Sequence, residues 1–523
     1  MRATAPLDRR RLLQLAAASA TTLWLPRSAW SQPRFSADPF ALGVASGTPD
    51  ATSAVLWTRL VAPEGAEPRE PVTVRWEVAH DEAFTRIAAS GQAQALPELA
   101  HSVHAEPGGL DPDRWYFYRF MTGDWASPVA RTRTLPAPDA AVQKLRLAYA
   151  SCQRWEHGFF SAWRHLRAEN PDAVVFLGDY IYEYGAGAPP VRPFAGGEAT
   201  TLADYRARHA LYKTDPDLKA LHAVCPWFMT WDDHEVQNDY AGDEAGFPGA
   251  ASDPRARRAA AYQAYYEHMP VRAGTLTRGV AGMQSGAEMR IYSRHRLGKL
   301  GDLYLLDARQ YRDRQVCNPV DRHGSSSLDP AKCPEWEDPK RTFLGRAQEQ
   351  WLDAQFASAP GGWNLVGQST LFGPRTLQGR LGPVRWNDGW DGYEAARRRF
   401  IESLRRNRVP NAVMLGGDVH ENWVGHVKAD YAQPASEPIG VEFCGTSITS
   451  HGGTQPLALD ALARNPHFVF ADAEHRGYGV VDVTPRALAV RLRGVERPER
   501  ADSGILTLAS FSVAAGVPRI ERT

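Results

Sequence analysis

The stretch that most constrains the fold runs from Ala173 to Glu183 and reads Ala-Val-Val-Phe-Leu-Gly-Asp-Tyr-Ile-Tyr-Glu. Its five apolar residues, 173–177, are typical of a short buried strand, and Gly178 ends the run. Asp179 therefore falls where the chain leaves the sheet, and ligands of open α/β sheets bind beyond the carboxyl ends of strands. A carboxylate there can bind a hard cation or bridge two, whereas the alternative is an aspartate that caps the next turn.

Polar side chains follow three further apolar runs. Cys152 follows the run 145–150, the segment 232–238 follows the run 225–231, and Asp418 and His420 follow the run 412–415. Because parallel strands end at one edge of a sheet, we expect these groups to share a site, and two cations about 3.5–4 Å apart would explain all four clusters. The residues that we take as candidate metal ligands are Cys152, Asp179, Tyr182, Asp233, Asn238, Asp418 and His420.

Each candidate ligand also has a structural interpretation. Cys152 could be an inert core thiol, Tyr182 a packing residue, and His420 a hydrogen-bonded buried histidine. The acidic segment 232–235 has the composition of a helix N-cap and first turn, and Asn238 suits an ordinary loop. A phenolate from Tyr182 would need a strongly Lewis-acidic metal, because a free phenol has a pKa near ~10.

Residues 36–135 have the pattern of an all-β domain. The segment 72–78 alternates apolar with polar residues, which is typical of a half-buried antiparallel strand, and the segments 54–60 and 114–120 are further predicted strands. The segment from Leu110 to Tyr116 resembles the tyrosine corner of fibronectin-like sandwiches. No catalytic constellation lies here, so we interpret these residues as an accessory β-sandwich.

A linker rich in proline and alanine, residues 135–142, marks the predicted domain boundary. Beyond it, strand and helix patterns alternate over residues 143–523, with helices expected at 159–169, 202–222 and 255–268. This alternation predicts a layered α/β catalytic domain with some antiparallel strands near its end.

The first 31 residues have the order of a signal peptide. Arg9 to Arg11 precede a mild apolar stretch from Leu12 to Leu25, and Ala29-Trp30-Ser31 offers small residues for cleavage. The arginine pair resembles a twin-arginine signal. We therefore expect a periplasmic or secreted protein with no transmembrane segment, since this stretch is shorter than the ~20 apolar residues that span a bilayer.

Composition narrows the function classes further. Among 523 residues, Lys plus Arg and Asp plus Glu both number 60, so a zero net charge gives no support for a stable nucleic-acid partner. Of the five cysteines, Cys317 and Cys333 bracket a polar loop and are the predicted disulfide pair. An odd number leaves at least one thiol free, and Cys152 is the candidate.

The segments at the strand ends, taken together, resemble the signature segments of PhoD-type alkaline phosphatases. They are Ser151-Cys-Gln153, Gly178-Asp-Tyr-Ile-Tyr-Glu183, Trp231-Asp-Asp-His-Glu-Val-Gln-Asn238 and Gly417-Asp-Val-His420. The segments 306–312, 390–393 and 445–450 look like further family segments. The resemblance implies a calcineurin-like metallophosphoesterase sandwich behind an N-terminal β-sandwich, and a site related to that of purple acid phosphatases, with Fe(3+) and Ca(2+).

The resemblance also implies roles for individual residues. Cys152, Asp179, Tyr182 and His420 would hold iron, with Asp179 as the bridge, while Asn238 and Asp418 would help to hold calcium. Asp233 and Asn238 compete for one ligand position. His234 would face the scissile phosphate and protonate the leaving oxygen.

The leading hypothesis is an exported alkaline phosphatase that hydrolyses phosphomonoesters, and also phosphodiesters, through a metal-bound hydroxide. The close alternative is a phosphodiesterase or phospholipase-D-like enzyme on the same scaffold, with residues 184–200 and 241–256 as lids. A non-catalytic exported binding protein and a mononuclear iron oxidoreductase are the other readings. Expected partners are small phosphate esters or phospholipid and nucleotide substrates, and the expected state is a monomer.

Overall fold

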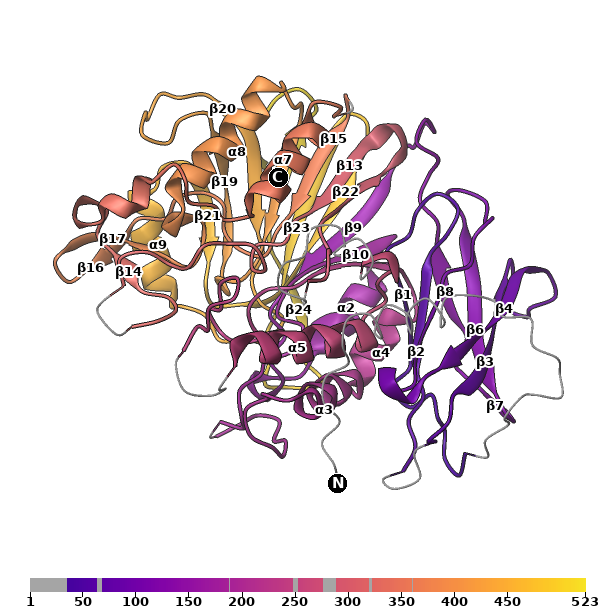
Figure 1. Cartoon of the computed structure of the whole chain (residues 1–523). Coiled ribbons are helices and arrows are strands. Elements are labelled where there is room, and N and C mark those ends of the chain that lie inside the picture. The colour runs from indigo at the N-terminus through magenta and orange to yellow at the C-terminus, as the bar shows by residue number, and fades with distance from the viewer. Residues whose placement is uncertain are drawn as a thin grey trace.

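The computed structural model describes residues 35–63, 68–187, 189–247, 253–275, 288–318, 322–359 and 361–523. The chain forms a layered α/β sandwich, with a smaller β-sandwich built from its N-terminal part (Figure 1). The predicted fold class is therefore confirmed. The predicted signal peptide, residues 1–31, lies outside the described residues.

The larger of the two central sheets has ten strands. Four parallel strands form its middle, and antiparallel strands extend it on both sides. In spatial order the strands are β25 (Glu521–Arg522), β24 (Ile505–Ala514), β23 (Ala487–Val495), β22 (Arg476–Val483), β9 (Leu145–Ala150), β10 (Ala173–Leu177), β11 (Trp227–Thr230), β1 (Val44–Gly47), β2 (Val55–Arg59) and β5 (Ser102–Ala105).

The second sheet has seven strands and faces the first. Its strands are, in spatial order, β12 (Ser293–Arg296), β13 (Gly301–Leu305), β15 (Trp363–Gly367), β18 (Ala412–Gly416), β20 (Pro438–Cys444), β19 (Asn422–Lys428) and β21 (Phe468–Asp472). Strands β13, β15, β18 and β20 are parallel. Apolar side chains of both sheets, including Val175, Leu177, Leu365 and Leu415, form one buried core between them. The short strands β14 (Ser327–Leu328), β16 (Leu377–Gly379) and β17 (Gly382–Trp386) form a separate small sheet.

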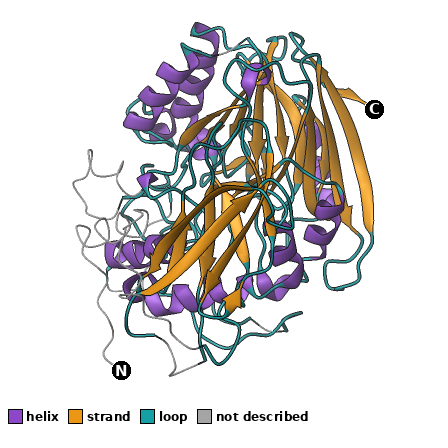
Figure 2. Cartoon of the chain, turned by 90° about the vertical axis from the view of Figure 1, so that its right-hand side faces the viewer, coloured by secondary structure: helices purple, strands orange, loops and turns teal. Residues whose placement is uncertain are grey.

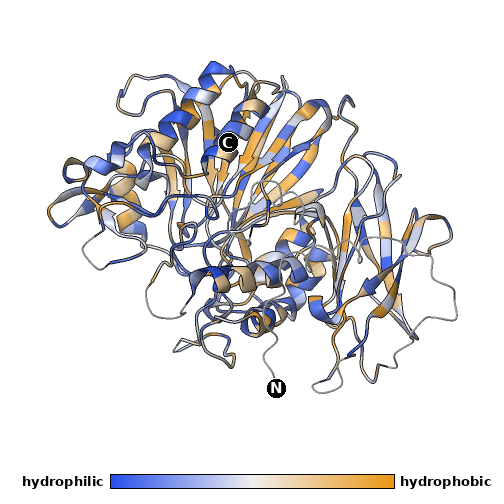
Figure 3. Cartoon of the chain, in the orientation of Figure 1, coloured by the Kyte–Doolittle hydropathy of each residue, from blue (hydrophilic) through white to orange (hydrophobic). Residues whose placement is uncertain are grey.

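Helices cover the outer face of each central sheet, and the strands between them are the more hydrophobic layer (Figures 2 and 3). The ten-stranded sheet is covered by α2 (Ser161–Ala168), α3 (Leu202–Lys213), α4 (Pro216–His222) and α5 (Pro254–His268). The seven-stranded sheet is covered by α7 (Arg346–Phe356) and α8 (Glu394–Arg406), and α9 (Gln455–Arg464) packs on β21. No helix among the described residues is long and apolar enough to cross a membrane.

The segment 202–222, expected to be largely helical, forms two helices. Thr201 and Asp204 form a capping box at the start of α3, and the helix ends at Lys213. Asp215 then caps α4, with Pro216 as its first residue. Proline has no N–H and its ring excludes the preceding helical turn, so the second helix has to start afresh at this position.

The N-terminal sandwich shares strands with the ten-stranded sheet. Its outer sheet contains β4 (Ile87–Ala95), β3 (Val72–Ala79), β6 (Trp115–Thr122), β7 (Trp125–Ala126) and β8 (Ala130–Arg133) and packs on β1, β2 and β5. The hydroxyl of Tyr116 accepts the N–H of Asp111 at 2.7 Å, as a tyrosine corner requires. Gly47 of β1 pairs with Trp227 of β11, and a Cβ on Gly47 would lie 2.5 Å from the carbonyl oxygen of Pro270. The domain limits 36–135 and 143–523 stay predictions.

The cysteines separate into one disulfide and three thiols. Cys317 and Cys333 are bonded to each other, as predicted. Cys152, Cys225 and Cys444 are free and buried. The disulfide closes a loop that lies outside the two central sheets, whereas Cys152 follows β9 directly.

Candidate metal and active site

The candidate site lies where strands of both central sheets end. Because β9, β10 and β11 are adjacent and parallel, they deliver Cys152, Asp179 and the segment 232–239 to the same edge. Asp418 and His420 follow β18, which belongs to the seven-stranded sheet. Our expectation of one shared sheet edge was therefore wrong for this fourth cluster: two facing sheets contribute, and a bridge between Ser151 and Ser447 joins them at the site.

The backbone is strained at four of the predicted ligands. Cys152, Asp179, Asp418 and His420 have φ angles of 60°, 57°, 64° and 56°. Residues with a Cβ rarely adopt this left-handed region, at a cost of roughly 1 kcal/mol or more each, and such residues concentrate at functional sites. The tight turns let side chains project over the ends of the strands from which they come.

The first cluster contains Cys152, Asp179 and His420, whose sulfur, carboxylate oxygen and ring nitrogen lie within 4.8 Å of one another. The hydroxyl of Tyr182 donates to Asp179 Oδ2 at 2.9 Å and lies 3.2 Å from His420 Nε2. His420 Nδ1 is 2.6 Å from the carbonyl oxygen of His451 and donates to it. The lone pair of Nε2 therefore faces the other three groups, as a metal ligand requires.

The electrostatics of the first cluster fit a highly charged cation. Burial, reinforced by neighbouring acidic groups, raises the pKa values of Cys152, Asp179 and Tyr182 well above their usual ranges. Burial also lowers the pKa of His420 to about 4. Three buried groups and a half-buried histidine, all driven toward their neutral forms, are costly to assemble, and a bound cation would reverse this effect by stabilising the thiolate, carboxylate and phenolate.

The second cluster is made of carboxylates. Asp232, Asp233 and Asp418 have oxygens within 4.8 Å of one another, and Asp179, Asp233 and His234 form an overlapping group. Asp179 therefore belongs to both halves of the site. Asp418 Oδ2 also accepts a hydrogen bond from Thr370 Oγ1 at 2.7 Å. Oxygen donors of this kind suit a hard divalent cation.

Asp233 and Asn238 differ in what their contacts show. Asp233 lies in three acidic groups of the site, the third being with Asp239 and Asp388. The backbone N–H of Asn238 donates to Glu183 Oε1 at 2.8 Å, which places Asn238 beside the site. Both residues therefore lie at the site, and both stay candidates for the ligand position for which they compete.

Arg309 forms ion pairs with carboxylates of the second cluster. Its guanidinium donates to Asp232 Oδ1, and its Nη2 lies 2.8 Å from Asp388 Oδ2 and 3.5 Å from Asp233 Oδ2. Burial alone would raise the pKa of Asp233, but Arg309 and His234 outweigh burial and lower it. Asp233 therefore stays ionised and available to a cation.

His234 is held in the site by Glu183, whose Oε2 lies 2.7 Å from His234 Nδ1. The imidazole packs against the ring of Tyr182 with centroids 4.1 Å apart. Burial alone would lower the pKa of His234, but Glu183, Asp233 and Asp179 outweigh it and raise the pKa well above its usual range. The imidazole therefore favours its protonated form, which suits an acid beside a leaving oxygen.

The alternative of a helix N-cap at 232–235 is wrong, because these residues form a turn and no helix follows directly. Glu235 instead accepts the backbone N–H groups of Asp179, Tyr180 and Asp232, and so ties two ligand-bearing loops together. Its position within the acidic segment was visible in the sequence, but its backbone partners were not.

Several supporting residues were missed by reasoning from chemistry alone. The hydroxyl of Ser450 lies 2.7 Å from that of Tyr182, and Thr370 contacts Asp418. Glu183, Arg309 and Asp388 orient or neutralise groups of the site. For three of them the available signal was membership of the quoted motif segments: Glu183 ends the stretch after β10, Arg309 lies in 306–312, and Ser450 ends 445–450. Thr370 and Asp388 lie in none of these segments.

Comparisons with known proteins agree with this geometry. The family model "PhoD-like phosphatase" matches residues 147–492, and "PhoD-like phosphatase, N-terminal domain" matches residues 26–136. "Alkaline phosphatase D" of Bacillus subtilis (strain 168) is 43% identical over 494 residues, or 92% of this chain and 81% of the relative. The solved "Structure of PhoD" has a TM-score of 0.85 at 41% identity and covers 94% of this chain and 93% of that one. The chain therefore belongs to the PhoD-like phosphatase family and is a hydrolase of phosphoric ester bonds.

Proposed function

We propose that this phosphatase is an exported, metal-dependent alkaline phosphatase that hydrolyses phosphomonoesters and also accepts phosphodiesters. The observation that carries the metal dependence is Asp179, whose carboxylate belongs at once to the group with Cys152 and His420 and to the group with Asp233 and His234. A carboxylate shared in this way is the arrangement that a two-cation phosphoesterase needs.

The two donor sets differ, which supports two different cations. Sulfur, phenol, imidazole and carboxylate from Cys152, Tyr182, His420 and Asp179 would hold Fe(3+). Oxygen donors from Asp179, Asp233, Asp418 and Asn238 would hold Ca(2+). When bound, the cations would supply Lewis acidity toward water and toward the phosphoryl oxygens.

The chain itself would orient the substrate and move the proton. His234, protonated and held by Glu183, would donate to the leaving ester oxygen as the bond to phosphorus breaks. Arg309 would keep Asp233 ionised while Glu235 keeps the loops of Asp179 and Asp232 in register. Aromatic packing of Tyr182 on His234 would exclude water from one side of the imidazole.

Export rests on residues 1–31, whose charged, apolar and small-residue segments follow the order of a signal peptide. The proposed mature chain has an accessory sandwich at 36–135 and a catalytic domain at 143–523. We propose that it acts as a monomer on small phosphate esters.

The experiment is elemental analysis of the purified protein, followed by an aryl-phosphate assay before and after calcium chelation. Iron near one per chain, an absorption band lost in Tyr182→Phe and chelator-sensitive phosphate release would support the proposal. Turnover with two divalent ions and no iron would refute the roles of Cys152 and Tyr182. Faster turnover of a bis-aryl phosphate than of the aryl phosphate would favour the phosphodiesterase alternative.

A further inference from the structure

Arg154 lies on the rim of the candidate site, two residues after Cys152. Its Nε and Nη2 both lie 2.7 Å from Oε1 of Glu156, a carboxylate that is only 4% exposed. This double contact fixes the plane of the guanidinium. Among the described residues, Nη1 has no hydrogen-bond partner, and the side chain is 19% exposed. One N–H edge of a permanent cation is thus free at the rim.

The guanidinium faces the site across two aromatic rings. Its Cζ lies 5.5 Å from the ring centroid of Tyr182 and 4.9 Å from that of Tyr184. Tyr184 in turn packs edge-on against His234, with centroids 5.1 Å apart. Arg154 therefore lies beside the rings of Tyr182 and Tyr184, both of which contact His234.

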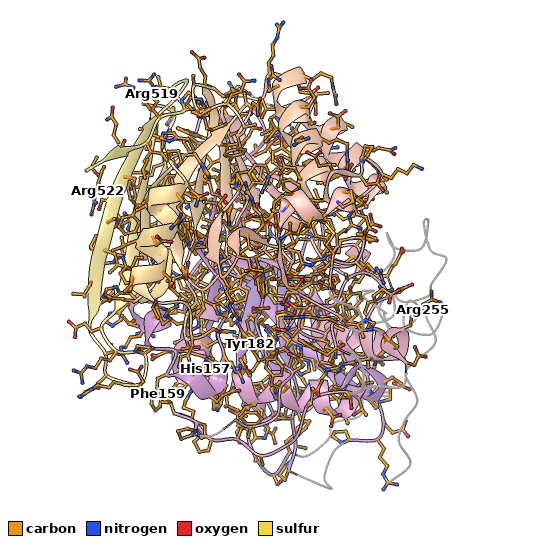
Figure 4. All side chains as sticks on the ribbon, turned by 90° about the vertical axis from the view of Figure 1, so that its left-hand side faces the viewer. His157, Phe159, Tyr182, Arg255, Arg519 and Arg522 are labelled. Atoms are coloured by element: carbon orange, nitrogen blue, oxygen red, sulfur yellow. A yellow bond between two sulfur atoms is a disulfide. The ribbon has the colours of Figure 1, made fainter. Side chains whose placement is uncertain are left out.

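A pair of stacked histidines completes this rim. The rings of His157 and His451 stack with centroids 3.7 Å apart, and the backbone N–H of His451 donates to His157 Nδ1 at 3.0 Å. This bond places the ring proton of His157 on Nε2, which is then a donor. The carbonyl oxygen of His451 binds the ring of His420, so the pair is fixed relative to the candidate ligand set. The contacts of His451 and His420 connect His157 to Tyr182, and Figure 4 labels both of these residues.

Two N–H donors held rigidly beside an anion-transfer site have a specific use. Arginine recognises phosphate through paired N–H groups, and the bonds are about twice as strong as neutral ones. The carboxylates and His234 already serve the phosphoryl group that is transferred. Arg154 and His157 lie outside that set, so they are available to the group that is attached through the ester oxygen.

We infer that Arg154 and His157 form a subsite for a second phosphate, carried by the leaving group of the substrate. The inference rests on the proposed phosphatase function and assigns it a substrate class, organic bisphosphates. Arg154 supplies the charge, Glu156 holds it in place, and His157 supplies a neutral donor. The chemistry at the transferred phosphoryl group is unchanged.

The test compares 4-nitrophenyl phosphate, fructose 6-phosphate and fructose 1,6-bisphosphate as substrates. The wild type should have a kcat/KM about tenfold higher for the bisphosphate than for fructose 6-phosphate, as one charge-assisted bond pair provides. Arg154→Met should remove this preference mainly through KM, and His157→Gln should reduce it about threefold. Arg86→Met is the matched control, because Arg86 is an exposed arginine whose partner is Asp81.

Each possible result either supports or overturns the proposed subsite. A wild type that hydrolyses 4-nitrophenyl phosphate without preferring the bisphosphate overturns the subsite and leaves the proposed function intact. An equal loss for all three substrates in Arg154→Met also overturns it, because Arg154 would then bind the transferred group. If wild type turns over none of them, both proposals fall. Should Arg154→Met not fold, Arg154→Lys and His157→Gln provide the same ratio.

Discussion

Two regions of this phosphatase bury many ionisable groups, and they treat charge in opposite ways. The first is the acidic site at the strand ends, around Asp179, Asp233 and Asp418. The second lies between the N-terminal strands and helices α3 to α5, and we call it the basic cluster. Its members are Arg59, His104, His209, Lys213, His222 and His268, next to the ring of Tyr180.

The basic cluster lacks an acid for Lys213. Lys213 Nζ and both ring nitrogens of His209 are buried without a hydrogen-bond partner among the described residues. The ammonium position lies 4.4 Å from the ring centroid of Trp57 and 5.2 Å from that of Tyr180. Glu267, a buried acid of α5, is taken by Arg206 and Gln263. Burial lowers the pKa of Lys213 to about 7.

The difference shows how a buried charge can be accommodated. In the acidic site Arg309 and hydrogen bonds keep Asp233 ionised, and the donors converge on places where a cation fits. In the basic cluster no counter-charge from the described residues faces Lys213, and burial lowers its pKa so that the lysine loses its proton near neutral pH. The acidic site keeps Asp233 charged, so that it can bind a cation. The basic cluster instead favours the neutral form of Lys213, which packs between aromatic rings.

The largest effect should come from Asp179→Asn. Because the proposed bridging carboxylate is lost, we expect kcat/KM on an aryl phosphate to fall about 10⁴-fold. The melting temperature of the metal-free protein should not fall, since one of several crowded buried carboxylates is removed. Asp460→Asn, an exposed change on α9, is the control. A large loss of stability in metal-free Asp179→Asn would show that the carboxylate of Asp179 stabilises the fold, which contradicts the contrast drawn between the two regions.

Lys213→Met should give the second-largest effect, which is a change in the stability of the protein. The unfolded lysine binds a proton with a pKa near 10.5 and the folded one near 7, so the unfolded state binds more protons in between and stability rises with pH. At pH 7 the free energy of unfolding of the variant should therefore exceed that of the wild type, by at most about 5 kcal/mol. Near pH 10.5 the two free energies of unfolding should be equal. Urea unfolding across this range measures the difference.

The control for Lys213→Met is Lys332→Met, whose side chain is 72% exposed. It should show no pH-dependent gain. A Lys213→Met variant that is less stable than wild type at pH 7 would mean that the lysine remains charged between its two aromatic rings.

The third change is His234→Gln, which removes the proposed proton donor and keeps its size and polarity. We expect kcat to fall about 10²- to 10³-fold with a smaller change in KM. The loss should be greatest for esters with poor leaving groups, because a good leaving group needs no proton. Glu183→Gln should show the same trend more weakly. An equal loss for good and poor leaving groups would contradict the role of His234.

The smallest change is Tyr180→Phe in the basic cluster. Its hydroxyl lies 2.9 Å from His222 Nε2, and losing this bond should cost about 1 kcal/mol of stability. Turnover should hold within about twofold, because Tyr180 directs its side chain away from the acidic site. A loss of turnover comparable to that of His234→Gln would show that the two regions are coupled.

Much of this arrangement followed from sequence pattern. Short apolar runs that end in Asp179 or Asp418 identified strands and their functional ends, since period and position are local signals. The split of the 202–222 helix was marked by Pro216. The contribution of two sheets to one site was not visible, because strand order depends on packing across the whole chain.

The supporting residues show the same limit. Two of the three backbone N–H groups that bond to Glu235 are more than 50 residues away, and the partners of Arg309 are side chains on two other loops. The basic cluster gave no sequence signal, because lone lysines and histidines on helices are usually exposed. Composition cannot tell a buried lysine from a surface one.

The position of β9 between two strands that are far apart in the sequence means that its part of the sheet is completed late in synthesis. Cys152 leaves the ribosome early, directly after β9, but β9 lies between β10 and β22, and β22 starts at Arg476. Until β22 has been synthesised, one edge of β9 has no partner, although the N–H of Cys152 can already bond to the carbonyl oxygen of Gly178 beyond β10. A chain interrupted before that point would thus hold every proposed ligand in its sequence, on a sheet whose ligand-bearing strand β9 is still open along one edge.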